Sequence, residues 1–246
     1  MKTKVWAHRG ASGYMPENTL PSFRKAVELG ADGIELDIQL SKDGEIVVCH
    51  DEMVDRTSNA KGWLKDYTLA ELKEMDFSCQ FKELGKVSIP TMKEVFELLK
   101  PTNLIINIEL KTGIFDYEGI EEKIIALTHA EGFEDRVIYS SFNHYSIMKI
   151  QELDPNAKTA FLYSDGPLDM PLYGYEHHVN ALHPAAYNLR LPDFMEECNV
   201  YHLDVNVWTV NTEEIALMCL KYGVNTLITN YPDRIKKVIE QYETGI

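Results

Sequence analysis

Cysteine is scarce in this sequence, and positive charge is in deficit. The four cysteines, Cys49, Cys79, Cys198 and Cys219, form no C-x-x-C pair. Single cysteines scattered among apolar neighbours favour reduced core thiols in a cytoplasmic protein over a disulfide framework or a zinc site. Lysine and arginine total 24 against 39 aspartates and glutamates, which gives a net charge of -15. Nucleic acid is therefore not expected as a partner, because non-specific phosphate binding requires clustered cations.

Long apolar runs and nucleotide-binding loops are also missing. No stretch approaches the roughly 20 apolar residues of a membrane-spanning helix, so integral membrane association is not expected. The start, Met-Lys-Thr-Lys-Val-Trp-Ala-His, lacks the apolar run of a secretory signal, which again favours the cytoplasm. The turn at residues 9–13 lacks the dinucleotide-binding fingerprint, and no Gly-Lys-Ser/Thr phosphate loop occurs. These absences exclude the common nucleotide-binding motifs.

The sequence does contain a regular alternation of short β-branched runs and amphipathic helical stretches. Such alternation is typical of a parallel sheet with crossover helices. About eight units in one chain favour an α/β fold of the (β/α)8 TIM-barrel type over an open doubly wound sheet. The expected barrel strands are residues 5–8, 33–40, 104–110, 137–140, 159–162, 180–183, 205–209 and 226–229, with a further β-run at 45–50.

Helical stretches are expected between most of these strands. Their ranges are 19–29, 91–99, 117–131, 143–153, 212–222 and 233–243. Start signals are the pairs Thr68 with Glu71, Thr91 with Glu94 and Asn211 with Glu214, together with Pro232 in a first turn. The alternation of strands and helices is interrupted once, at residues 52–90, which contain a short helix at 68–75 and no obvious barrel strand. We interpret this segment as a small insertion after the second strand, within a single domain covering residues 1–246.

Carboxylates interrupt two strongly apolar strands. In residues 33–40, Glu35 and Asp37 alternate with apolar side chains, and the period of two puts both on one face with Cα atoms roughly 6.6 to 7 Å apart. Glu109 occupies a matching position in the next strand. Because the apolar face must meet the outer helices, all three should point into the barrel. Such oxygen donors suit a hard divalent cation, Mg²⁺ or Ca²⁺; a salt-bridge network with Arg9 and Lys111 is the alternative.

Two histidines end neighbouring β-runs at the same expected rim. His8 closes the first strand and His50 follows the run at 46–49, so together they offer a proton acceptor and a proton donor near neutral pH. Either could instead be a hydrogen-bonded structural histidine. Arg9 and Lys111 bring fixed positive charge to this rim, which favours an anionic substrate, most simply a phosphate. The alternative is that they only neutralise the carboxylates.

Several short motifs occur in order along the whole chain, and as a set they are highly specific. They are His8-Arg9-Gly10, Pro16-Glu17-Asn18-Thr19, Gly30-Ala31-Asp32-Gly33-Ile34-Glu35-Leu36-Asp37, Lys42-Asp43-Gly44, Val47-Val48-Cys49-His50-Asp51, Glu109-Leu110-Lys111, Ser140-Ser141-Phe142, Trp208-Thr209-Val210-Asn211 and Thr229-Asn230-Tyr231-Pro232. With these motifs the sequence resembles the glycerophosphodiester phosphodiesterase family. The resemblance implies a TIM barrel with a small insertion after the second strand.

The resemblance also implies roles for individual residues. It implies Glu35, Asp37 and Glu109 as metal ligands, His8 and His50 as the general acid-base pair, Arg9 and Lys111 as phosphate contacts, Glu17 as a supporting residue close to the site, and Phe142 and Trp208 as walls of a glycerol pocket. Glu17 could instead be a loop or helix-entry residue, and the two aromatic residues could be ordinary core. Asn230 stands where many relatives have Asp.

The expected activity is metal-dependent hydrolysis of a small glycerophosphodiester to glycerol 3-phosphate and an alcohol. We favour His8 as the base and His50 as the acid. Two alternatives are a lysophospholipase D or C-like activity on lysolipids and a barrel that binds glycerophosphodiesters without turnover. The second would be expected to have lost a histidine or a carboxylate, and this sequence retains them all.

Overall fold

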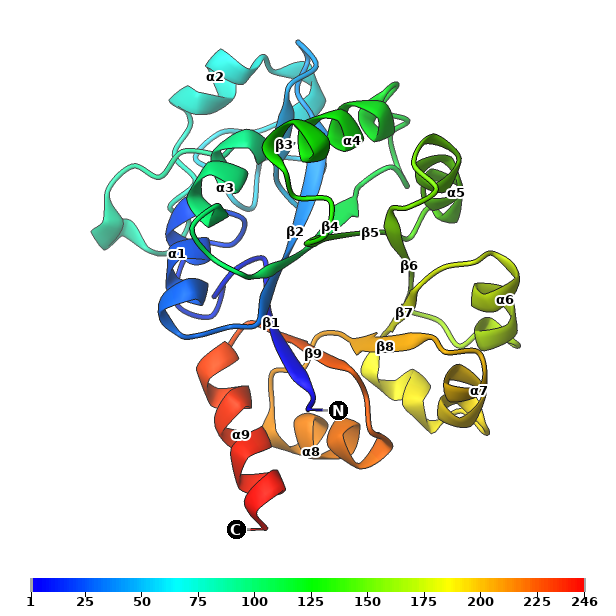
Figure 1. Cartoon of the computed structure of the whole chain (residues 1–246). Coiled ribbons are helices and arrows are strands. Elements are labelled where there is room, and N and C mark those ends of the chain that lie inside the picture. The colour runs from blue at the N-terminus through cyan, green and yellow to red at the C-terminus, as the bar shows by residue number, and fades with distance from the viewer. Residues whose placement is uncertain (1, 246) are drawn as a thin grey trace.

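The computed structural model describes residues 2–245, and within this range nine strands form a single sheet. Eight of the strands run parallel and close into a ring, because β1 pairs with β2 on one side and with β9 on the other. The helices surround this ring (Figure 1). The predicted (β/α)8 barrel is therefore confirmed.

The barrel strands agree with the predicted ranges to within about two residues at each end. They are β1 (Lys4–His8), β2 (Gly33–Leu40), β4 (Ile105–Leu110), β5 (Val137–Ser141), β6 (Lys158–Tyr163), β7 (Ala181–Pro184), β8 (Asp204–Val207) and β9 (Thr226–Thr229). The ninth strand, β3 (Ile46–Val48), lies outside the ring and pairs antiparallel with the end of β2. It corresponds to the additional β-run expected at 45–50.

The α-helices follow the barrel strands, apart from α2, which lies in the insertion. They are α1 (Leu20–Glu28), α2 (Leu69–Glu74), α3 (Met92–Leu99), α4 (Ile120–Glu131), α5 (His144–Leu153), α6 (Met170–Glu176), α7 (Phe194–Val200), α8 (Glu213–Tyr222) and α9 (Pro232–Thr244). The short α6 and α7 were not predicted. Pro171 and Gly174 weaken the helical signal of α6, and both helices begin from a left-handed aspartate without a side-chain cap.

Three of the four predicted helix starts are confirmed, and one is wrong. Pro232 opens the first turn of α9. Thr68 and Thr91 each cap a helix and receive a reciprocal bond from the glutamate three residues later. At α8, however, the cap is Thr212, whose hydroxyl accepts the Ile215 N–H. Asn211 does not cap this helix because its side-chain oxygen instead accepts a hydrogen bond from the Asn230 N–H at 2.9 Å, in the loop after β9.

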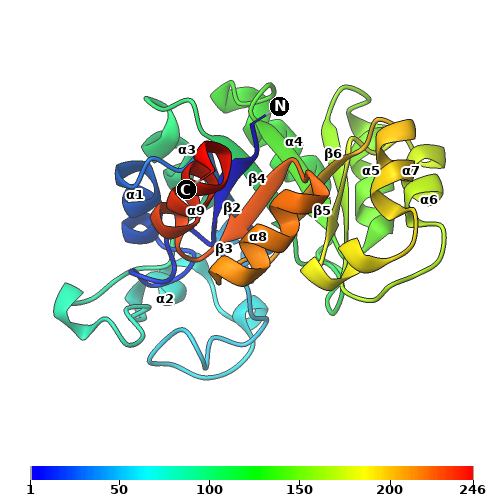
Figure 2. The same cartoon turned by 90° about the horizontal axis from the view of Figure 1, so that it is seen from below.

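Residues 52–90 fold as a cap beside the barrel and contribute no strand to its ring over this fully described stretch. Besides α2 they contain two 3-10 helices, η1 (Leu64–Asp66) and η2 (Lys82–Leu84). A second, smaller core buries their apolar side chains against β3; its members are Val47, Cys49, Val54, Leu64, Leu72, Met75, Phe77 and Ile89. Figure 2 shows this cyan segment on the side of the molecule opposite the N-terminus, where the parallel strands end.

The four cysteines are all free thiols. Cys49, Cys198 and Cys219 are buried as predicted, and burial raises the pKa of each thiol. Cys79 is the exception, since it is partly exposed on the insertion and donates its S–H to the Thr57 carbonyl. None of the described helices has the length and apolarity needed to cross a membrane.

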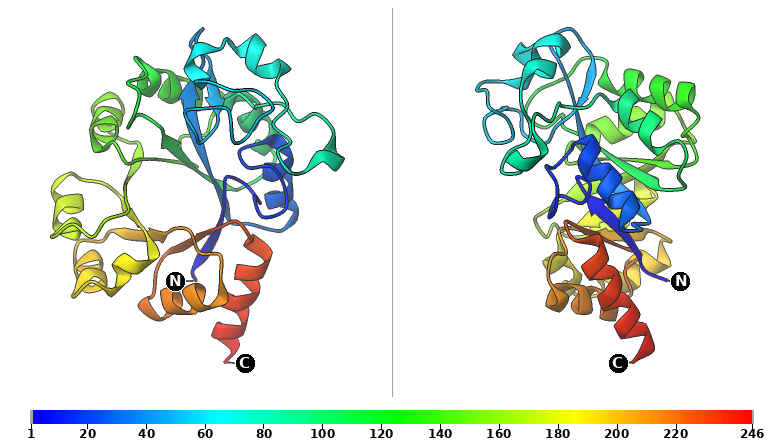
Figure 3. Two further views of the ribbon diagram at one scale, coloured as in Figure 1. Left: turned by 180° about the vertical axis from the view of Figure 1, so that it is seen from behind. Right: turned by 90° about the vertical axis from the view of Figure 1, so that its left-hand side faces the viewer.

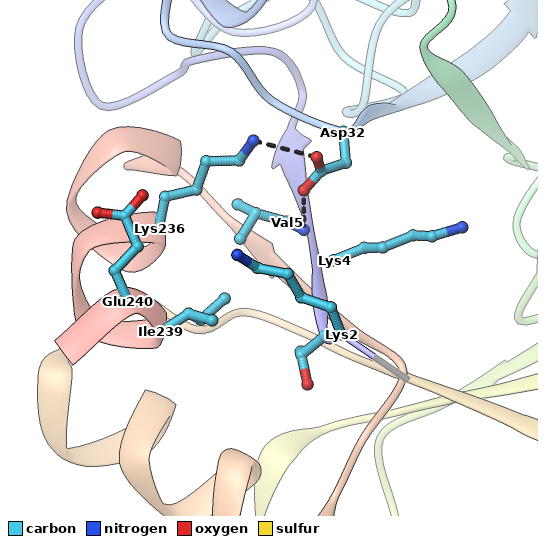
Figure 4. A pocket seen from close by; sticks show the side chains of 8 residues that line it. Lys2, Lys4, Val5, Asp32, Lys236, Ile239 and Glu240 are labelled. Atoms are coloured by element: carbon cyan, nitrogen blue, oxygen red, sulfur yellow. Dashed lines mark hydrogen bonds and ion pairs between the residues drawn. The ribbon is translucent and has the colours of Figure 1, made fainter. Parts of the chain in front are cut away.

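The amino ends of the strands are tied together by Asp32, which precedes β2. Its carboxylate accepts the Val5 N–H at 2.8 Å and the Lys236 ammonium at 3.0 Å, beside a cavity of about 360 Å³ (Figure 4). These two hydrogen bonds join β1, the turn before β2 and α9 at one point. In Figure 3 the red α9 and the dark-blue α1 lie next to β1. In barrels this face contributes stability rather than catalysis.

The barrel interior contains a buried histidine whose charge state affects stability. His183 on β7 is fully buried, its Nε2 accepts the Asn206 amide, and burial lowers its pKa to about 3. At pH values below about 6.5, the ordinary pKa of histidine, the His183 side chain is therefore protonated in the unfolded chain but stays neutral in the folded barrel. The free energy of unfolding consequently falls as the pH drops.

We predict that His183→Gln, which cannot titrate, reduces this acid sensitivity. Between pH 7 and 5 the wild-type free energy of unfolding should fall by about 2 kcal/mol more than that of the variant, at about 1.4 kcal/mol per pH unit below 6.5. Urea unfolding at both pH values measures the difference. The same pH dependence in both proteins would contradict the assignment.

Candidate active site

A cavity of about 310 Å³ opens where the barrel strands end. It is lined by His8, Arg9, Glu35, His50, Asn107, Glu109, Phe142, Leu162, Ser164, Trp208 and Ile228. Seven of these are residues that the sequence singled out. Strand register explains why they meet, since His8 of β1 pairs with Glu35 of β2, and Asp37 of β2 pairs with Glu109 of β4.

The three carboxylates of Glu35, Asp37 and Glu109 converge beside this cavity. Each offers an oxygen within 4.8 Å of the others, and all three residues are buried. Burial and the charge of Asp37 raise the pKa values of Glu35 and Glu109. Burial would also raise the pKa of Asp37, but Arg9, His50, Lys111 and a hydrogen bond from Asn18 hold it at about 2. The cluster is thus a site of concentrated negative charge.

Two cations lie against this cluster. The Lys111 ammonium is 2.9 Å from Glu109 Oε1 and 4.0 Å from Asp37 Oδ1, and Arg9 Nε is 3.5 Å from Asp37 Oδ2. The main-chain N–H of Arg9 also donates to Glu35 Oε2 at 2.9 Å. The three carboxylates still outnumber the two cationic side chains, and Asp37 Oδ1 is buried without a hydrogen-bond partner. The oxygen-only donors and this free oxygen fit a hard divalent cation.

His8 is held in one orientation by a neutral partner. Its Nδ1 is 2.7 Å from the side-chain oxygen of Asn230, so this nitrogen carries the proton and donates it. Nε2, on the other side of the ring, lies 3.9 Å from Glu35 Oε2. Burial and then the charge of Arg9 lower the pKa of His8 to about 4. The ring is therefore neutral at pH 7, with an unprotonated Nε2 at the cavity.

His50 is held by a charged partner instead. Its Nδ1 is 2.7 Å from Asp51 Oδ1. The main chain around it is fixed by Gln39 of β2, whose amide donates to the carbonyls of Cys49 at 2.8 Å and Asp51 at 2.9 Å. His50 is therefore hydrogen-bonded through Nδ1 to an anionic side chain, whereas His8 is hydrogen-bonded through Nδ1 to a neutral amide.

The remaining sequence candidates occupy distinct places. Phe142 and Trp208 meet edge to face with ring centroids 5.6 Å apart on the cavity wall, and Phe142 is 45% exposed. Glu17 lies outside the lining and accepts from Arg9 Nη1 at 2.8 Å. Asp37 and Lys111 likewise lie just behind the lining residues, in contact with them.

Some residues at the site had no role assigned from the sequence. Asn18 and Asn230 belong to motifs that identified the site, and their side chains bind Asp37 and His8 respectively. Asn107 lines the cavity, and its buried side-chain oxygen has no hydrogen-bond partner. Its position two residues before Glu109 in the same strand could have predicted that both side chains face the barrel interior. Arg56, which contacts Glu17 and Asp51, carried no signal because an exposed arginine in an irregular insertion is ordinary.

Comparison with known proteins agrees with this geometry. The model of the glycerophosphoryl diester phosphodiesterase family matches residues 8–234. Proteins named glycerophosphodiester phosphodiesterase are 43% identical in Caldanaerobacter subterraneus subsp. tengcongensis, over 98% of this chain and 99% of that protein, and 42% identical in Bacillus altitudinis, over 97% and 99%. A phosphodiesterase of Oleispira antarctica, solved with the product sn-glycerol-3-phosphate, has a TM-score of 0.86 and 29% identity over 97% of each chain. The chain therefore belongs to the glycerophosphoryl diester phosphodiesterase family.

Proposed function

We propose that this protein hydrolyses glycerophosphodiesters to glycerol 3-phosphate and an alcohol, and that residues 1–246 act as one domain in doing so. The observation that carries the proposal is the convergence of three buried carboxylates, two cations and two oriented imidazoles around one cavity. The names of its relatives support the same reaction. The four free thiols agree with a reducing compartment, so we also propose a cytoplasmic location.

Glu35, Asp37 and Glu109 would hold a divalent cation, Mg²⁺ or Ca²⁺. When bound, the ion supplies positive charge for the phosphate oxygens. Arg9 and Lys111 lie next to the same carboxylates and would contact the remaining phosphate oxygens. Fixed charges of this kind stabilise a transition state because they need no reorganisation as its negative charge develops.

The two histidines would divide the proton transfers according to their partners. Asn230 leaves Nε2 of His8 unprotonated, so this nitrogen accepts the proton of the nucleophile, either water or the neighbouring glycerol hydroxyl. If the hydroxyl attacks, water then opens the resulting cyclic phosphodiester. Asp51 orients His50 through Nδ1, so that the other ring nitrogen of His50 would face the site and donate a proton to the leaving alkoxide. Phe142 and Trp208 would wall the pocket for the glycerol carbons.

A lysophospholipase D or C-like reaction on lysolipids is the second candidate. One observation favours it, since apolar side chains are exposed on the loops that follow the strands, with Ile114 at 67%, Phe142 at 45% and Leu168 at 90%. An acyl chain could lie against such residues. A non-catalytic glycerophosphodiester-binding barrel is less well supported, because both imidazoles are oriented by hydrogen bonds.

Divalent cations should stabilise the fold through the carboxylate cluster. We expect Mg²⁺ or Ca²⁺ to raise the Tm of EDTA-treated protein, because a ligand present at 100 times its Kd adds about 2.7 kcal/mol of stability. Asp37→Asn should abolish this increase, and differential scanning calorimetry measures both proteins. Glu121→Gln is the control, since Glu121 is buried on α4 and pairs with Lys149 instead. An equal Tm increase in Asp37→Asn would contradict the assignment.

Loss of either histidine should remove most of the activity. General acid-base catalysis contributes about 10² to 10⁴ in rate, so we expect His8→Ala and His50→Ala each to lower kcat by at least about 10². Release of glycerol 3-phosphate from glycerophosphocholine, glycerophosphoethanolamine and glycerophosphoinositol, with each cation in turn, measures this. Activity close to wild type in one variant would remove that histidine from the mechanism. If no cation and substrate pair gives product with the wild type, the proposed function is wrong.

A further inference from the structure

One arginine of the insertion, Arg56, binds two carboxylates at the rim of the active-site cavity. Its Nε and Nη2 donate to the two oxygens of Asp51 at 2.7 and 2.9 Å. Its Nη1 and Nη2 donate to the two oxygens of Glu17 at 2.7 and 2.8 Å. Arginine suits this arrangement because its planar fork of donors matches carboxylate geometry, which the single ammonium of lysine does not.

Each of these carboxylates also contacts a residue of the proposed mechanism. Asp51 Oδ1 accepts the hydrogen bond from His50 Nδ1 at 2.7 Å, and Glu17 Oε1 accepts from Arg9 Nη1 at 2.8 Å. Arg56 is therefore one contact away from both His50 and Arg9. These residues come from three separate segments, the loop after β1, the turn after β3 and the insertion.

We infer that Arg56 is a positioning residue: it holds Asp51 so that His50 keeps its proton on Nδ1, and it holds Glu17 so that Arg9 stays directed at the phosphate site. This inference rests on the proposed function for the parts played by His50 and Arg9. It gives the insertion a part in the reaction, although Arg56 itself lies outside the cavity lining.

Exposure separates this role from a simple contribution to folding. The Arg56 side chain is 50% exposed, and ion pairs at that exposure add little to stability. Asp51 and Glu17 are more enclosed, at 27% and 20%, so without the guanidinium two partly buried carboxylates would be left without this shared partner. Burial would raise the pKa of Asp51, but the hydrogen bonds from Arg56 and His50 hold it well below its usual range.

The backbone that carries Arg56 is itself fixed. Val54 and Thr57, on either side of it, are buried, and Val54 belongs to the small core between the insertion and β3. The Val54 N–H donates to the Gly62 carbonyl and the Ser58 N–H to the Val54 carbonyl, at 3.0 and 2.9 Å. Arg56 therefore extends from an anchored turn, as positioning requires.

Kinetics of Arg56→Ala in the cation-loaded enzyme test the inference. We expect kcat to fall about 10- to 100-fold with little change in Tm, because misplacing a catalytic group by about 1 Å can cost up to about 10²-fold in rate. Guanidinium chloride at non-denaturing concentration should restore part of the activity, whereas sodium chloride of equal ionic strength should not. Lys86→Gln, which removes an exposed ion pair to Glu74 in the same insertion, is the matched control and should keep wild-type kinetics.

A mutant cycle tests the route through Asp51. If Arg56 acts mainly on His50, Asp51→Asn combined with Arg56→Ala should be hardly slower than Asp51→Asn alone. Arg56→Lys keeps the charge but cannot bind both carboxylates with two bonds each, so it should recover less than half of the lost kcat. A kcat for Arg56→Ala within twofold of wild type, fully additive losses in the cycle, or full activity of Arg56→Lys would each overturn the inference.

The state of the His50 ring gives a readout that does not depend on activity. Long-range ¹H–¹⁵N NMR spectra should show the neutral ring of His50 protonated on Nδ1 in the wild type and a mixture of tautomers in Arg56→Ala. An unchanged tautomer would overturn the inference. If the tautomer changes but the wild type hydrolyses no glycerophosphodiester, the proposed function fails while the positioning of His50 by Arg56 stands.

Discussion

The mutual repulsion of Glu35, Asp37 and Glu109 is the constraint around which the active face of this barrel is built. Three carboxylates within 4.8 Å of one another in a buried space cannot all remain charged without positive partners. Arg9 and Lys111 supply part of this positive charge, and the Asn18 amide donates a hydrogen bond to Asp37. They leave one oxygen of Asp37 unbonded, and the donor set suits a hard cation. The cations that neutralise the cluster are thereby also placed where a phosphate would lie.

The two histidines show how the same side chain can be given opposite tasks. His8 is bonded to an amide and His50 to a carboxylate, both through Nδ1 and both at 2.7 Å. The neutral partner fixes the tautomer of the His8 ring and leaves its Nε2 free to accept a proton, whereas the His50 ring is oriented by an anionic side chain. The proposed assignment of base and acid follows from this difference.

The insertion after β3 matters because it places charged groups on the rim of a preformed barrel. Its own apolar core holds it against β3, and from that support Arg56 reaches both Asp51 and Glu17. Rigid support of this kind is what a positioned acid or base requires, since small displacements of reacting groups reduce the rate steeply. At the opposite end of the strands, Asp32 joins β1 to α9, on the face that contributes stability in barrels.

The sequence by itself determined the barrel and the chemistry of its rim. Strand periodicity is local, so the inward direction of Glu35, Asp37 and Glu109 could be read from residues two apart, and the motifs identified His8 and His50. Only the tertiary structure decided which groups these residues meet. Asn211 bonds to Asn230 instead of capping a helix, Asn230 orients His8, and Arg56 joins Glu17 to Asp51. Except for the bond between Arg56 and Asp51, these contacts join residues from separate segments of the chain. They depend on how those segments pack, and no local pattern encodes them.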